Sequence, residues 1–247
     1  MFAARLTRLG TLSLLMLLLA ACGTTRGSLK SEFEQKDDRQ ASALSSGRRT
    51  AANRSSRPVA KPMRGGAALS QTIHKRREWG ALAFNPKKLD GVGGNWEKIT
   101  VHHSDEVGAL IFNGTFSQSA QAVRSIQRQH LQGNGWGDIG YHYVIDARGR
   151  IFEGRPINWQ GAHAGDSAKN KRNLGICLLG NFNKHALSAQ AREALRGLLE
   201  DLRKVHRIPR KEIYVHSEFT STECPGHHLT DWVKSYRGGG SLSHSPR

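Results

Sequence analysis

The sequence predicts an α/β domain with one mixed central β-sheet that is flanked by helices. Strand-like and helix-like segments alternate along residues 98–236 in the order strand, helix, hairpin, strand, helix, strand, helix, which favours a sheet with helices on its faces. Leu174–Leu179 is a continuous apolar run, as expected of a buried central strand. Ser188–Val205 gathers its apolar residues into one stripe at helical spacing, as expected of a helix that packs on the sheet.

The first strand and the first helix follow from hydrophobic periodicity. Lys98–His102 alternates polar and apolar residues, which indicates a strand that ends at its histidine. The next segment, Ser119–Leu131, is predicted to be a helix because Val123 and Ile126 recur on one side.

A hairpin, a short strand and a last helix complete the predicted domain. Tyr141–Asp146 and Ile151–Glu153 flank the turn-forming segment Ala147–Arg150, which is typical of a β-hairpin. Glu212–His216 is predicted to be a short strand, and Leu229–Tyr236 is predicted to close the domain as a helix.

Length and composition limit the class of protein. The 247 residues suffice for one ordinary domain with a tail, or for two small domains. Apolar residues make up 37% of the chain and 27 residues are glycine, which excludes a polytopic membrane protein. Three cysteines cannot form a disulfide framework, so each is interpreted in its own context.

Residues 1–21 have the pattern of an export signal. A short basic start is followed by the apolar stretch Leu9–Ala21, which is too short for a confident membrane-spanning helix. Leu19–Cys22 resembles the lipobox of bacterial lipoproteins, which implies that Cys22 becomes the lipid-modified first residue, and Gly23 resembles the default sorting to the outer membrane. The alternative is an ordinary secretory signal with a chance cysteine.

Residues 22–72 are predicted to be a disordered basic tether. They are rich in Ser, Arg, Ala, Lys and Gly and show neither strand nor helix periodicity, and residues 23–77 hold 13 Lys and Arg against 4 Asp and Glu. Such a tether suits contact with anionic lipid or an anionic wall polymer, although a charge run is usually a solvated surface. No nucleic-acid-binding motif is present. The predicted domain spans 73–237, and 238–247 is predicted to be a flexible tail.

Two histidines and a cysteine form a candidate metal site. His102 and His216 each end a strand whose apolar residues face the opposite side, and Cys224 follows eight residues after the second histidine. Two imidazoles and one thiolate suit zinc, and three protein ligands leave a fourth position open for catalysis. His103 competes with His102 as a ligand, and the spacing alone leaves open that all these histidines are satisfied surface or core residues.

Several short segments carry a resemblance to a known family when taken together and in order. They are Arg77–Ala81 (REWGA), Ile99–Ser104 (ITVHHS), Gly135–Ile145 (GWGDIGYHYVI), Phe152–Arg155 (FEGR), Gly161–Ala164 (GAHA), Leu174–Phe182 (LGICLLGNF) and Thr222–Gly226 (TECPG). The chain resembles the type 2 N-acetylmuramoyl-L-alanine amidases, a family that includes the bacteriophage T7 lysozyme and the peptidoglycan recognition proteins. The resemblance covers nearly all of residues 77–237.

The resemblance implies a role for each matching position. His102, His216 and Cys224 match the zinc ligands, and the motif favours His102 over its neighbour. Tyr141 matches the catalytic tyrosine, which orients the attacking water and donates a hydrogen bond to the reacting amide. Thr222 matches the position two before the ligand cysteine, where other members carry lysine or threonine.

Other polar residues near these motifs have less definite roles. His163 is expected to line the cleft and to assist protonation of the leaving amine, with a structural hydrogen bonder as the alternative. His142 is expected to pack behind the site, and Cys177 to be a buried residue of the central strand. Asp138 and Glu153 orient ligands or cap a turn.

The resemblance implies a zinc-dependent amidase that hydrolyses the bond between N-acetylmuramic acid and L-alanine of peptidoglycan or muropeptides during cell-wall remodelling. The expected protein is a monomer, anchored through Cys22 at the outer membrane and facing the periplasm, without a nucleic-acid partner. One alternative is a peptidoglycan-binding lipoprotein without catalysis. Another is a basic adhesive lipoprotein, which only the tether supports.

Overall fold

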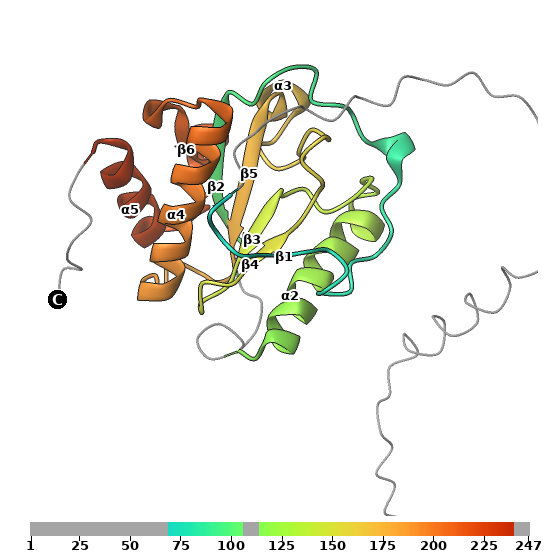
Figure 1. Ribbon diagram of the computed structural model, residues 1–247, viewed down its shortest axis with the longest axis horizontal. Helices are drawn as coiled ribbons and strands as arrows, with labels where there is room; N and C mark the ends of the chain where they lie inside the picture. Colours follow the sequence, from blue (N-terminus) through green and yellow to red (C-terminus); the bar gives the residue numbers. More distant parts are fainter. Residues whose placement is uncertain (1–68, 106–113, 240–247) are drawn as a thin grey trace, which may run out of the picture. The chain divides into compact units, whose positions relative to one another are not determined.

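Six β-strands form one mixed sheet at the centre of the fold (Figure 1). The structure, a computed structural model, describes residues 69–105 and 114–239. Across the sheet the strands are β1 (Ile73–His74), β4 (Ile151–Glu153), β3 (Tyr143–Ile145), β5 (Asn173–Leu178), β2 (Lys98–His103) and β6 (Ile213–Val215). β3 and β4 form the predicted antiparallel hairpin, and every other neighbouring pair is parallel. The predicted mixed sheet is confirmed.

Helices cover both faces of this sheet (Figure 1). The helices are α2 (Phe116–Arg128), α3 (Ser167–Asn170), α4 (Ala189–His206) and α5 (His227–Arg237), with a π turn η3 (Gln129–Gly133) and the 3-10 turns η1 (Pro86–Lys88), η4 (Arg210–Glu212) and η5 (His216–Glu218). α4 and α5 lie on one face, whereas α2 packs on the other.

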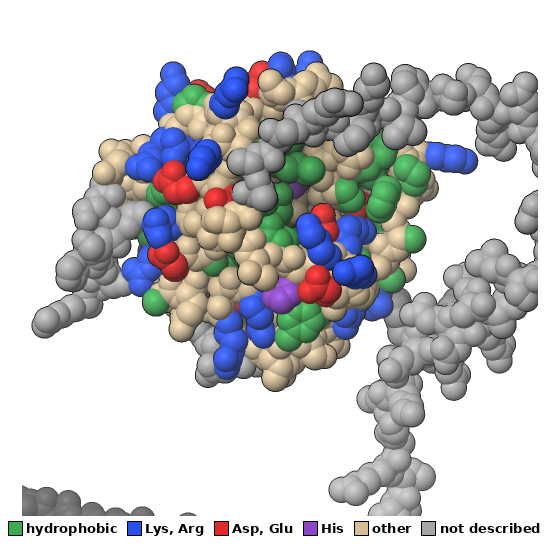
Figure 2. Space-filling view, in the orientation of Figure 1, with side chains coloured by type: hydrophobic (Ala, Val, Ile, Leu, Met, Phe, Trp, Pro, Cys, Tyr) green, Lys and Arg blue, Asp and Glu red, His purple; other side chains and the backbone are tan. Residues whose placement is uncertain are grey.

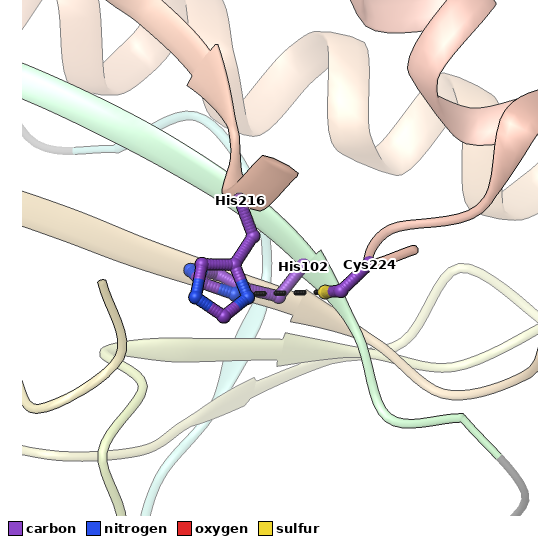
Figure 3. Close-up of side chains that lie close together, drawn as sticks. All are labelled: His102, His216 and Cys224. Atoms are coloured by element: carbon purple, nitrogen blue, oxygen red, sulfur yellow. Dashed lines mark hydrogen bonds between the residues drawn. The ribbon is translucent and has the colours of Figure 1, made fainter. Parts of the chain in front are cut away.

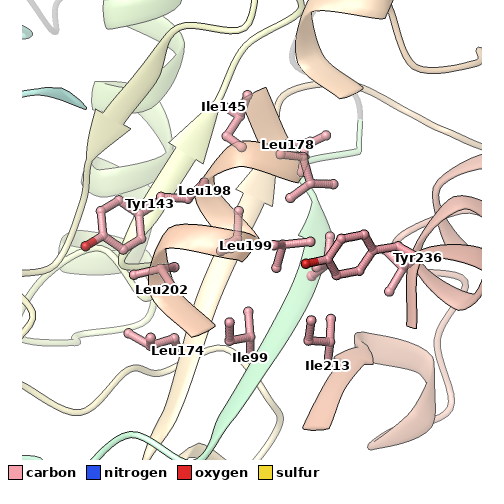
Figure 4. Close-up of a cluster of buried hydrophobic side chains, with 14 of the residues drawn as sticks. Ile99, Tyr143, Ile145, Leu174, Leu178, Leu198, Leu199, Leu202, Ile213 and Tyr236 are labelled. Carbon is pink, nitrogen blue, oxygen red and sulfur yellow. The ribbon is translucent and has the colours of Figure 1, made fainter. Parts of the chain in front are cut away.

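Strand alternation divides the core into two clusters. Ile99 and Val101 of β2 pack with the leucines of α4 and with α5, whereas Cys177 of β5 packs with the apolar side of α2. Figure 4 shows the first cluster, with Leu199 of α4 above the sheet and Tyr236 of α5 beside it. His102, on the opposite side of β2 from these apolar residues, is therefore directed to the other face of the sheet.

The predicted elements are all present, with ends that differ by a few residues. α4 starts after Ser188, whose side chain caps it by accepting from the backbone N–H of Ala191 at 3.0 Å. α2 begins three residues earlier than predicted because Thr115 and Gln118 form a capping box. β1 and α3 had no periodicity to predict them, since they span only two and four residues.

The predicted export signal, Cys22 and most of the tether lie outside the described residues, as do 240–247. Their predicted roles stay predictions. Among the helices that the structure describes, none is long and apolar enough to cross a membrane.

Acidic and basic side chains are interspersed on the surface shown in Figure 2. Ion pairs of α4 illustrate the pattern: Arg203 contacts Glu200 at 2.8 Å, and Arg210 contacts the same carboxylate at 2.7 Å. All three side chains are partly exposed, so such pairs contribute little to stability, at most about 1 kcal/mol each.

Candidate metal centre and adjoining cleft

His102, His216 and Cys224 converge at one edge of the sheet (Figure 3). β2 and β6 are neighbouring parallel strands, so their carboxyl ends lie at the same edge, and each histidine stands at or just after such an end. Cys224 reaches the same place from the loop before α5. One ligand atom from each residue lies within 4.8 Å of the other two.

The donor set and its surroundings fit a zinc ion. Sγ of Cys224 lies 3.8 Å from Nδ1 of His102, and Nε2 of His216 is buried without a hydrogen-bond partner among the described residues. Two imidazole nitrogens and one sulfur are ligands that zinc prefers over calcium or magnesium. The set therefore has the chemistry and the spacing for zinc, and three protein ligands are the number found in catalytic zinc sites.

Burial keeps this donor set free of positive charge. Burial, and after it the neighbouring imidazole rings, lowers the pKa of His102 well below its usual range, and burial also lowers the pKa of His216. Burial raises the pKa of the Cys224 thiol to about 12. Both rings are neutral at pH 7 and present lone pairs, and a bound cation would favour the thiolate.

His103 is directed away from these three ligands. Its Nδ1 accepts a long hydrogen bond, 3.4 Å, from the backbone N–H of Phe182, and its own backbone N–H points at Sγ of Cys224 at 3.4 Å. This geometry agrees with the expectation that the first histidine of the pair is the ligand.

His163 lies behind His102 and contacts it directly. Its Nδ1 is 3.0 Å from Nε2 of His102, and its Nε2 is 3.0 Å from the carbonyl oxygen of Asn173. The ring occupies space that two glycines leave free. A Cβ on Gly175 or on Gly161 would lie 2.5 Å from Cδ2 of His163, so neither position has room for a side chain.

Tyr141 stands on the cleft side of the candidate metal centre. Its ring centroid is 5.1 Å from that of His102 and 5.6 Å from that of His130. Burial, with a smaller effect of the thiols of Cys177 and Cys224, raises the pKa of Tyr141 well above its usual value. The phenol therefore stays protonated at neutral pH and serves as a hydrogen-bond donor.

A cavity of about 640 Å³ adjoins the candidate metal centre at His216. Its lining includes Tyr141, His163 and His216, and it continues over the segment that carries Trp136. Further lining residues come from η1, from α3 and from loops: Lys88, Asp90, Gln160, Asp166, Ser167, Asn170 and Thr220. The candidate ligand His216 thus opens onto a space of the size that takes small-molecule ligands.

Thr222 does not line this cavity. It is exposed, and its hydroxyl oxygen accepts a hydrogen bond of 3.2 Å from the backbone N–H of Cys224. In the structure Thr222 shapes the turn that carries the ligand cysteine. Its expected catalytic contribution stays a prediction.

Four other residues named from the sequence have structural contacts. His142 accepts from the backbone N–H of Gly175 and its Nε2 lies 3.0 Å from the carbonyl of Trp159. The buried carboxylate of Asp138 pairs with Arg76 at 2.9 Å. Glu153 pairs at the sheet edge with Lys75, at 3.8 Å, and Cys177 is fully buried, as expected.

Sequence reasoning did not find the loop residues of the cavity or the role of Asn170. The Asn170 side chain accepts from the backbone N–H groups of His163 and Ala164, at 2.8 and 2.9 Å, and so fixes the GAHA segment. A buried asparagine shortly before a central strand is a weak signal in one sequence. Its importance depends on the fold, which holds the end of α3 against the GAHA segment.

Comparisons with known proteins agree with this geometry. Residues 92–227 match the Amidase_2 family, described as N-acetylmuramoyl-L-alanine amidase. Peptidoglycan-recognition protein SC2 of Drosophila simulans is 32% identical over 171 residues, which cover 69% of this chain and 89% of that protein.

Solved structures give the same result. The N-acetylmuramoyl-L-alanine amidase LysC from Clostridium intestinale is similar with a TM-score of 0.55 and 26% identity, covering 70% of this chain and 100% of that one. A mutant of Drosophila PGRP-LB in complex with tracheal cytotoxin is similar with a TM-score of 0.58 and 28% identity, covering 66% of this chain and 93% of that one. The chain therefore belongs to the N-acetylmuramoyl-L-alanine amidase family, which its sequence motifs resemble.

Proposed function

We propose that this protein is a zinc-dependent amidase that hydrolyses the amide bond between N-acetylmuramic acid and L-alanine in peptidoglycan or muropeptides. The observation that carries the proposal is the complete set of three ligands, whose donor atoms lie within 4.8 Å of one another beside an open cavity. A binding site without catalysis has no need of such a set.

Zinc in such a site supplies Lewis acidity toward a carbonyl oxygen and makes water a nucleophile near neutral pH. The chain supplies the remaining functions. His102, His216 and Cys224 would hold the ion, beside the cavity that His216 lines. Tyr141, protonated and 5.1 Å from the His102 ring between centroids, donates a hydrogen bond to the oxygen on which negative charge develops.

The cavity suits a ligand that carries sugar, amide and charged groups. Lys88 and Asp166 bring opposite charges to its lining, and Trp136 brings an aromatic surface. The related PGRP-LB mutant was solved with tracheal cytotoxin, which in another related structure, that of PGRP-LE, is described as monomeric diaminopimelic acid-type peptidoglycan. These relatives support a muropeptide as the ligand class of this cavity.

A peptidoglycan-binding module without catalysis is the second candidate. The relatives that are named recognition proteins favour it. The presence of both the three-residue ligand set and Tyr141 beside His102 favours the enzyme, because recognition alone requires neither a thiolate ligand nor a hydrogen-bond donor beside the metal site.

The proposal extends to the location of the protein. The lipobox-like Leu19–Cys22 supports a lipid anchor on Cys22, and Gly23 supports the outer membrane, with the enzyme facing the periplasm. The basic residues of 22–72 support contact with anionic lipid or wall polymer. An enzyme held in this way would act on the wall as a monomer.

Two variants of the full-length protein separate metal binding from chemistry. Cys224→Ser is expected to lose zinc and amidase activity together, because a neutral hydroxyl replaces the thiolate. Tyr141→Phe is expected to keep zinc and to lower kcat about 100- to 1000-fold, the cost of removing one hydrogen bond to a developing oxyanion. Zinc content and release of stem peptides from purified peptidoglycan are measured on the same samples. Unchanged turnover of Tyr141→Phe would remove this residue from the mechanism, and an active Cys224→Ser without metal would refute the zinc mechanism.

A further inference from the structure

We propose that His163 is a positioning residue that fixes His102 in the one tautomer able to bind the metal through Nδ1. This inference deepens the proposed function and rests on its metal centre. It assigns to His163 a role different from the proton donor expected from the sequence.

The direction of each hydrogen bond follows from counting protons. The carbonyl oxygen of Asn173 is an acceptor only, so Nε2 of His163, 3.0 Å away, must carry the proton that it donates. The ring of His163 is buried, and no carboxylate among the described residues is hydrogen-bonded to it, so a second proton would leave an unpaired buried charge and the ring carries only one. Nδ1 of His163 is therefore an acceptor.

The position of the proton on His163 also fixes the position of the proton on His102. Since Nδ1 of His163 accepts, Nε2 of His102, 3.0 Å away, must donate. An imidazole that binds a metal carries one proton, so that of His102 is on Nε2 and its Nδ1 presents the lone pair. That nitrogen is the one that lies 3.8 Å from Sγ of Cys224. The carbonyl of Asn173, through two rings, selects the ligand atom of His102.

The surroundings of His163 hold this chain in one geometry. A Cβ on Gly161 or Gly175 would lie 2.5 Å from the ring, so the ring fits closely against both backbones. Asn170 accepts from the backbone N–H of His163 at 2.8 Å and fixes the segment that carries the ring. Thr100 donates to the side chain of Asn173 at 2.9 Å and so holds the residue whose carbonyl accepts from His163.

Both ring nitrogens of His163 are therefore occupied within the protein. A proton given from Nε2 to a leaving amine would break the bond to Asn173, and Nδ1 faces His102 rather than the cavity. The geometry favours positioning over proton transfer.

Two substitutions at position 163 each keep one of the two hydrogen bonds of His163. The side-chain amide of asparagine reaches about as far as Nδ1 of histidine, and that of glutamine about as far as Nε2. His163→Asn keeps an acceptor for His102, whereas His163→Gln keeps the donor to Asn173 and leaves Nε2–H of His102 without a partner. In the full-length protein we expect zinc affinity, measured by competition with a chromophoric chelator, to fall 10- to 100-fold in His163→Gln and less in His163→Asn. His74→Gln, on β1 at the far edge of the sheet, is the matched control and should keep the affinity of the unaltered protein.

A measurement on the unaltered, metal-free protein removes the dependence on folding of the variants. Long-range ¹H–¹⁵N NMR correlations of the imidazole rings should show the proton on Nε2 in both His102 and His163. A proton on Nδ1 of His102, or equal zinc affinity of His163→Gln and the unaltered protein, would overturn the inference. Zinc binding by the unaltered protein without amidase activity would instead refute the proposed function and leave the positioning role intact.

Discussion

Replacing Gly175 with alanine is expected to disturb the metal centre through His163 without touching a ligand. A Cβ at this position would lie 2.5 Å from Cδ2, 2.7 Å from Cγ and 2.8 Å from Nε2 of His163. Carbon atoms in ordinary contact are about 3.5–4.0 Å apart, so the ring must move by about 1 Å. Such a shift takes the 3.0 Å bond between His163 and His102 beyond hydrogen-bonding range.

The expected magnitudes follow from these contacts. Overpacking a close-packed interior costs about 1–3 kcal/mol of unfolding free energy. Loss of the bond that orients a metal-ligating histidine lowers metal affinity about 10- to 100-fold. Gly175→Ala should show both effects, and its metal-free stability should fall independently of zinc.

Urea unfolding in the presence of a chelator measures the first effect, and chelator competition measures the second. Gly91→Ala is the matched control, because no atom lies within 4 Å of a Cβ at that position. A Gly175→Ala protein with the stability and zinc affinity of Gly91→Ala would refute the reasoning, since the close approach of His163 to β5 would then have no energetic consequence.

Three other outcomes are expected. His130 accepts from the backbone N–H of Gly140 at 3.0 Å, and burial lowers its pKa to about 4. The imidazole of the unfolded chain binds a proton already near pH 6.5, so the metal-free protein should lose up to about 3 kcal/mol of unfolding free energy between pH 6.5 and 4. His130→Asn should show a smaller loss in the same urea titrations. Arg76→Ala removes the ion-pair partner of the buried Asp138 carboxylate, 2.9 Å away, and leaves it the hydrogen bonds from Gln127 and Ile139. The variant should cost about 3 kcal/mol in urea unfolding at pH 7, whereas a loss below about 0.5 kcal/mol, as at ordinary surface sites, would contradict the pair's importance. Cys22→Ala should abolish lipid attachment, seen as loss of acyl mass and of membrane fractionation, and continued membrane fractionation would refute the anchor.

The sequence was most informative where periodicity is long. The stripe of Ser188–Val205 and the apolar run Leu174–Leu179 predicted α4 and β5 to within about one residue at each end. β1 could not be predicted, because a two-residue strand has no period and exists through its pairing with β4. The end of α2 was also beyond pattern reasoning, since the last predicted residues form a π turn.

The ligand triad was partly predictable because strand alternation fixes where His102 points. The spacing alone left the metal open, and the family resemblance supplied the assignment. The contact between His102 and His163 depends on the parallel pairing of β2 with β5 and on the glycine opposite Thr100 in that register, which are properties of the folded chain. Residues that act through a fold-dependent contact of this kind carry no local signal in one sequence.

The most direct test of the proposed amidase is digestion of purified peptidoglycan by the full-length protein, with and without a zinc chelator, followed by mass spectrometry of the products. The ligand geometry of His102, His216 and Cys224 predicts release of stem peptides that begin with a free L-alanine amino group, lost with the chelator and restored by zinc. Tight binding to the wall with no cleavage, at any pH and with zinc present, would contradict the enzyme and favour a recognition module.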